Sequence, residues 1–120
     1  MKAEERAKEL LKAAGIPVYD PGQQVGQCKE PYVVPQCFGS YPSISGWRAS
    51  YSLMLINCYV PLDGHQTHAL GELVEKVREV MRSMQKQAKP TGNMSVDIIE
   101  NAYKALTRTI EYQILRPIKE

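Results

Sequence analysis

The order of periodic segments along this chain restricts its fold more than any other feature. A helical apolar pattern at residues 2–14 precedes two extended runs at 31–37 and 49–60, a second helical pattern from residue 63, and a final alternating run at 110–114. A period of 3.6 residues indicates an amphipathic helix, and strict alternation indicates a half-buried strand. The order therefore predicts an α+β fold, and the length of 120 residues predicts one domain over residues 1–120.

Two main helices are expected to flank the sheet. The first covers residues 2–14 and ends at Gly15, which stands where a left-handed cap belongs. The second begins with Asp63 as N-cap and Gln66 at the capping-box position. Its apolar stripe is expected to pack on strand 49–60 and consists of Leu70, Leu73, Val74, Val77, Met81, Met84 and Ala88.

The extended runs predict a small mixed or antiparallel sheet of about four strands. Residues 49–60 are apolar on both faces, which favours a central strand or one covered on both sides. Residues 31–37 read as a strand interrupted by Pro35, and residues 16–19 as a short edge strand. Segment 95–106 fits two interpretations: its alternation favours a hairpin into the last strand, and its helical spacing keeps a helix as the alternative.

Composition and charge are those of an ordinary soluble domain. Apolar residues make up 43% and charged residues 23%, and the formal net charge is +2. So small an excess of basic over acidic residues gives no electrostatic argument for a nucleic-acid or membrane partner. No apolar run approaches the roughly 20 residues that span a bilayer. The segment Met1 to Arg6 has acids where a signal peptide needs an apolar stretch, so we expect a cytoplasmic protein.

The histidines and cysteines offer only weak candidates for a metal site. His65 and His68 are three residues apart, with Cys58 a little before them. Zinc requires four ligands in tetrahedral order, usually from tight pairs, whereas the cysteines here are scattered. We therefore expect surface histidines, no metal and no cofactor.

A catalytic thiol is equally weakly supported. Cys28 or Cys37 would need an electropositive, partly exposed setting and an oriented base, and Lys29 is the only local hint. In a reducing compartment all three cysteines should be buried thiols, and a disulfide forms only if the protein later meets an oxidising medium. No phosphate-binding glycine motif is present, and the tyrosines lack the basic-aromatic run of an RNA-binding sheet. The sequence thus predicts a protein that is not an enzyme.

Aromatic residues in a predicted loop are the best candidates for contacts with a partner. Segment 38–47 mixes them with glycine, proline and serine, and it runs into Trp47 and Arg48, two residue types enriched at interface hot spots. Trp47 has a second interpretation, as a plug at the end of the core. A further candidate surface lies near the connection at 101–106. The candidate interface residues are Phe38, Tyr41, Trp47, Arg48, Tyr103 and Arg108.

The chain resembles the tail terminator, or tail-completion, proteins of tailed bacteriophages. The resemblance lies in the element order, with Gly-Ile-Pro-Val-Tyr after the first helix, Glu-Pro-Tyr-Val-Val at 30–34, Ile-Asn-Cys-Tyr-Val-Pro at 56–61, Leu-Val-Glu-Lys-Val-Arg at 73–78 and Arg-Thr-Ile-Glu-Tyr-Gln-Ile at 108–114. It spans nearly the whole chain and has no sharp motif.

The resemblance implies a structural virion protein with no catalytic residue. Such a protein forms a ring, expected to be a hexamer, that caps the tail tube and joins it to the head-side connector. Its partners would be further copies of itself, the tail tube protein and the connector, with DNA passing through the lumen without specific binding. The virion neck would be its final location, after assembly in the host cytoplasm.

Three other functions remain open at this point. The first is another neck or tail component of a phage, with a similar role at a different position. The second is a cellular α+β binding or regulatory domain with a ligand in a groove between sheet and helix. A small thiol enzyme comes third.

Overall fold

The computed structural model describes residues 3–24, 26–42 and 49–117, with the strand segments 38–42, 49–51 and 115–117 described by their backbone alone. Two helices and five strands follow in the order α1 (Ala3–Ala13), β1 (Tyr32–Pro42), β2 (Ala49–Pro61), α2 (Gln66–Arg82), β3 (Ala88–Met94), β4 (Ile98–Glu100) and β5 (Ala105–Pro117). The α+β prediction is confirmed, and the sheet has five strands where about four were expected.

The sheet is antiparallel throughout and has the order β1-β2-β5-β3, with β4 also paired to β5. Strands β3 and β4 lie on the same side of β5, one after the other along its length. Strand β3 pairs with residues 110–114 of β5, and β4 pairs with residues 105–107. Strand β2 is central, as expected. The hairpin interpretation of segment 95–106 is confirmed, and the helical alternative is wrong.

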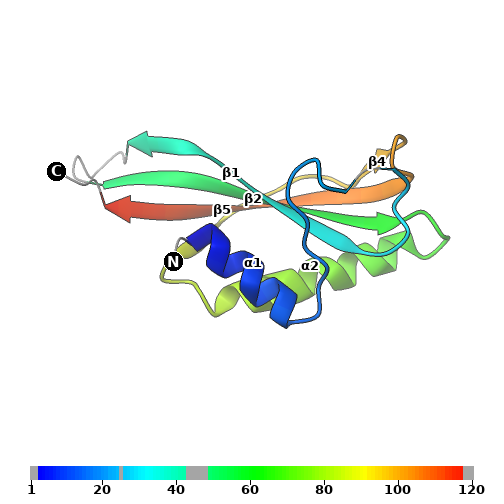
Figure 1. The fold of residues 1–120 in the computed structure, drawn as a ribbon, viewed down its shortest axis with the longest axis horizontal. Helices are drawn as coiled ribbons and strands as arrows, with labels where there is room; N and C mark the ends of the chain where they lie inside the picture. The colour runs from blue at the N-terminus through cyan, green and yellow to red at the C-terminus, as the bar shows by residue number, and fades with distance from the viewer. Residues whose placement is uncertain (1–2, 25, 43–48, 118–120) are drawn as a thin grey trace.

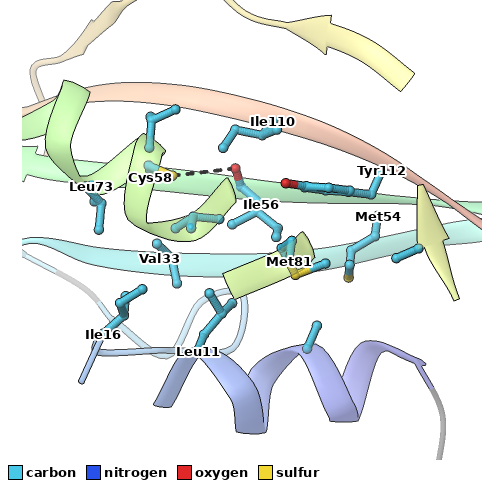
Figure 2. Packing of buried hydrophobic residues seen from close by; sticks show 14 of the residues in the cluster. Leu11, Ile16, Val33, Met54, Ile56, Cys58, Leu73, Met81, Ile110 and Tyr112 are labelled. Atoms are coloured by element: carbon cyan, nitrogen blue, oxygen red, sulfur yellow. Dashed lines mark hydrogen bonds between the residues drawn. The ribbon is translucent and has the colours of Figure 1, made fainter. Parts of the chain in front are cut away.

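Both helices pack on one face of the sheet, α1 over β1 and α2 over β2 and β5 (Figure 1). Alternate residues of β2 point into this layer and are fully buried: Met54, Ile56, Cys58 and Val60. They meet the predicted stripe of α2, in which Leu70, Leu73, Val74, Val77 and Met81 are buried (Figure 2). The last two residues of the expected stripe are also buried but are not helical, because Met84 follows the end of α2 and Ala88 begins β3. Leu11 and Ile16 close the core beneath α1. The described part of this core leaves no buried side-chain polar atom without a partner.

The end of α1 shows why Gly15 stands where it does. Its φ of 84° is in the left-handed region, and the Ile16 amide donates to the Leu11 carbonyl at 3.1 Å. This is the six-to-one bond of a Schellman cap, with both apolar partners in the core. The predicted cap is confirmed.

Pro35 does not interrupt β1, contrary to expectation. The Val33 amide donates outward to the Pro17 carbonyl at 3.0 Å, and the Tyr19 amide donates to the Val33 carbonyl at 3.0 Å. Backbone groups alternate along a strand, so Pro35 also faces the outer edge, where its missing N–H removes no bond to β2. The expected strand at 16–19 is reduced to one parallel bridge between Val18 and Val33.

Two further boundaries differ from expectation. The predicted loop at 38–47 is wrong in its first part, because β1 continues to Pro42 after a register shift between Phe38 and Ser40. The second helix begins at Gln66 and ends at Arg82, with His65 rather than Asp63 as N-cap. The carboxylate of Asp63 instead accepts from the His65 amide at 2.9 Å, so it braces the turn before the helix.

Candidate assembly surfaces

Three strands continue past the end of the core and form an arm. Toward this end of the sheet, the last row of buried residues across the strands consists of Ser52 of β2, Ile114 of β5 and Ala88 of β3. Beyond it, β2 still pairs with β5 through three more positions, Tyr51 to Ala49, and with β1 as far as Pro42. At about 3.3 Å per residue the arm is about 10 Å long. It lies at the left of Figure 1, within a molecule measuring 51 × 26 × 25 Å.

The first two predicted contact residues lie in β1 near the arm. Backbone pairing places Phe38 opposite Leu53, before the arm begins, and Tyr41 opposite Tyr51, within it. They belong to a strand rather than to the expected loop. Trp47 and Arg48 lie outside the described residues, so both interpretations of Trp47 stay open.

Exposed apolar side chains gather at the opposite end of the sheet. Segment 94–99 crosses from β3 to β4 beside the first half of β5. Leu62 joins this end because its amide donates to the Lys104 carbonyl at 3.2 Å. The exposed fractions are 39% for Leu62, 39% for Met94, 77% for Val96, 46% for Ile98 and 57% for Ile99. Five apolar side chains left in water at one end of a small domain indicate a contact surface.

Arg108 holds this segment in place. Its Nε donates to Oδ1 of Asp97 at 2.6 Å, and this bond raises the pKa of the guanidinium. Its Nη1 also contacts the sulfur of Met94 at 3.8 Å. Next to it, Ser95 and Thr109 exchange backbone and hydroxyl bonds at 3.0 and 2.9 Å. The exposed apolar segment is therefore fixed in shape rather than hanging free.

Tyr103 belongs to a cluster of four tyrosines at the same end, on the face of the sheet away from the helices. The rings of Tyr32 and Tyr59 stack with centroids 4.8 Å apart, while Tyr19 and Tyr103 meet them edge-on at 5.3 and 6.4 Å. Residues 26–31 close over the cluster through the Cys28 amide, which donates to the Tyr103 carbonyl at 2.7 Å. Burial raises the pKa of Tyr32 to about 12. The cluster is a second small core.

Tyr103 and Arg108 therefore stand on opposite faces of the sheet. Arg108 pairs with Cys58, which is buried on the helix side, whereas Tyr103 packs on Tyr59 of the other side. Among the described residues of β2, only those near its C-terminal end, around Tyr59, are covered on both faces. Nearer the arm, Leu53 and Leu55 are half-buried on the face away from the helices.

The thiols and histidines have settings that follow from the fold. Burial raises the pKa of the Cys28 thiol and raises that of Cys58 to about 12, so neither is a ready nucleophile. His65 and His68 are exposed, and His68 Nε2 lies 2.9 Å from a Glu72 carboxylate oxygen. Among the described residues no three metal-ligating side chains come together, and no described helix is long and apolar enough to cross a membrane.

A groove on the helix side is a ligand-sized space with a partly apolar lining. It has a volume of about 400 Å³ and lies between the turn after α1, the start of β1 and α2. Leu73 and Ile16 form its floor, and Glu30, Glu72 and Lys76 surround it. The space between sheet and helices is itself filled by core side chains.

Sequence reasoning missed the exposed residues of segment 94–99. Met94, Val96 and Ile98 alternate with polar residues, and alternation predicts a strand with a buried face. What it does not reveal is whether anything covers that face. A signal was present in the next residue, because Ile99 breaks the alternation and makes β4 apolar on both sides.

No protein-family model matches this sequence, and comparison with curated proteins gives no significant match.

Proposed function

We propose that this chain is a structural subunit that assembles into a hexameric ring on the end of a phage tail tube and joins it to the head-side connector. The observation that carries the proposal is the placement of two unlike features at opposite ends of one elongated sheet. One is the three-stranded arm, and the other is the apolar set Leu62, Met94, Val96, Ile98 and Ile99. The resemblance to tail terminators supports the same role.

Two unlike surfaces are what a closed ring of identical subunits needs. In a cyclic assembly each copy contacts one neighbour with one patch and the other neighbour with a different patch. A symmetric dimer would instead use one self-complementary patch. The arm and the apolar end lie along the same β5 strand, ten residues apart between Ala105 and Leu115, which is about 33 Å. Such a separation lets both neighbours bind at once.

The size of the apolar end favours contacts that are weak until a template is present. The exposed apolar surface at this end amounts to a few hundred Å², whereas a stable interface buries about 800 Å² on each partner. A tube end that binds several subunits together raises the effective concentration of each for its neighbours. The free chain is then a monomer and the ring forms on the tube.

The charge of the chain fits a lumen through which DNA slides. Tight binding to the DNA backbone requires clustered Lys and Arg that neutralise several phosphates. Here 15 basic residues are offset by 13 acidic ones, which gives a net charge of +2. The subunit would surround DNA without holding it.

The direct test mixes the purified protein with tail tubes and images the tube ends by electron microscopy. We expect a ring-shaped density at one end of each tube, with six subunits. Ile99→Lys should abolish this density, and Gln85→Lys, an equally exposed position after α2, should leave it unchanged. Tubes with bare ends would overturn the proposal, and density along the tube or on the connector alone would favour another neck component.

A second candidate function rests on the groove at α2. Its volume of about 400 Å³ and its mixture of Leu73 with Glu72 and Lys76 suit a small molecule that carries a charged group. Such a ligand would stabilise the fold by mass action. A screen of small charged metabolites that raises the melting temperature of the wild type but not of Lys76→Ala would favour this function over the ring.

A further inference from the structure

The edges of this sheet differ in how well they are protected against pairing with a strand of another chain. The outer edge of β1 is covered at Val33 by residues 17–19 and carries Pro35, which cannot donate. The outer edge of β3 carries Pro90 and an irregular stretch before Met94. Prolines and bulges are devices by which sheets prevent pairing with other chains. Segment 96–100, which contains β4, has neither.

The backbone of β4 can accept another strand. The Thr107 hydroxyl on β5 donates to the Ile98 carbonyl at 3.2 Å, so the backbone groups of Ile98 point toward β5. By alternation those of Ile99 point to the outer edge. Among the described strands β4 pairs with β5 alone, so no strand lies on that side.

The side chains of β4 would contact an added strand on both faces of the sheet. Ile98 pairs with Thr107, on the face away from the helices, whereas Ile99 pairs with Leu106, on the helix face. With exposed fractions of 46% and 57%, both retain apolar surface to bury. Added strands bind through main-chain bonds, and alternating side-chain pockets give them specificity.

We propose that the outer edge of β4 receives the arm strand β1 of a second copy of this chain, which extends the sheet from one subunit to the next. The occupant must be an extended edge strand, and β1 provides one: it lies at the edge of the sheet, runs on to Pro42, and among the described strands forms its ladder with β2 alone. The arm and β4 lie at opposite ends of the molecule, so their pairing is head-to-tail. This inference deepens the proposed ring and rests on it.

Charge does not oppose this contact. Glu100 ends β4 and is exposed, while Asp97 is engaged by Arg108. The sequence of segment 38–51 contains no acid and one base, Arg48. Pairing the two therefore brings no like charges together, as a register-specific contact between copies requires.

Cross-linking of two variants, each with one introduced accessible cysteine, tests which strands meet. In a Cys37→Ser background, where the remaining native thiols are buried, one protein carries Ile99→Cys and the other carries Tyr41→Cys. The two are mixed at high concentration, and separately on tail tubes, with a short bis-maleimide. We expect the 41–99 adduct to exceed the 99–99 adduct at least tenfold. A Gln85→Cys protein, exposed outside the proposed contact, is the matched control for Ile99→Cys.

Three other outcomes overturn the inference in distinct ways. A dominant 99–99 adduct means symmetric pairing of β4 with itself. An adduct between Ile99→Cys and the tube protein, without the 41–99 adduct, means that the tube occupies the edge. Adduct at the level of the Gln85→Cys control means that β4 receives no copy. Capped tubes without the 41–99 adduct would refute this inference but not the proposed function. The 41–99 adduct in solution together with bare tube ends would refute the proposed function but not this inference.

Discussion

Replacing Val77 by aspartate tests the packing of α2 on the sheet at its centre. Val77 is fully buried in the middle of the apolar stripe, within a cluster of buried apolar side chains. The change removes an apolar side chain and places a carboxylate in the same space. Both consequences act against the folded state.

The magnitude follows from these two losses. Burying a valine side chain contributes about 1.5–3 kcal/mol, and an uncompensated buried charge costs several kcal/mol more. The expected loss of at least about 4–5 kcal/mol is a large part of the 5–15 kcal/mol that a domain of this kind has. At about 4 °C per kcal/mol for this chain length, the melting temperature should fall by about 20 °C.

Circular dichroism melts and urea titrations measure the effect against two further variants. Lys76→Asp puts the same residue on the exposed side of α2 and should cost less than about 1 kcal/mol. Val77→Ala should cost about 2 kcal/mol through lost burial and a small cavity.

The pH dependence gives Val77→Asp an additional signature. Burial raises the pKa of the new carboxyl, so the folded state binds its proton more tightly than the unfolded state does. Part of the lost stability should therefore return as the pH is lowered through that raised pKa. A soluble, cooperatively folded Val77→Asp protein with unchanged melting would refute the packing described above.

Further predictions concern alkali, backbone conformation and the ion pair at the apolar end. Burial raises the pKa of Cys58 from 9.0 and that of Tyr32 from 10.0, each to about 12. The contribution of these two groups to stability is therefore complete below about pH 9 and is lost as the pH rises toward about 12. Urea unfolding midpoints should fall steadily over that range, and Tyr32→Phe should make the fall less steep. Gly15→Ala should cost about 1 kcal/mol because the φ of 84° is strained for alanine, whereas Gly71→Ala, inside α2 with open space around it, should add about 0.5–1 kcal/mol; equal shifts in melting temperature would contradict this. Asp97→Asn should cost about 1 kcal/mol or less, because the pair is partly exposed, and should speed amide hydrogen exchange at 94–100 with no change in α2.

The local patterns determined much of the fold. The stripe of α2 identified which residues of that helix face the core, because periodicity is a property of neighbouring residues in one element. Strand β2 is apolar on both faces, so its alternation left open which face the helices cover. Gly15 indicated the end of α1 for a similarly local reason, since few residues adopt a positive φ there. The last strand was placed correctly but was too short, because its flanking residues carry no alternation of their own.

Only the tertiary structure decided which surfaces remain open. Pro35 looked like an interruption until its outward direction was known, and that direction depends on the pairing of β1 with residues far away in the chain. The same holds for Tyr103 and Arg108, which are five residues apart yet lie on opposite faces, and for the exposed apolar residues of segment 94–99. A sequence records which side of an element is apolar, but long-range strand pairing determines whether another element covers that side.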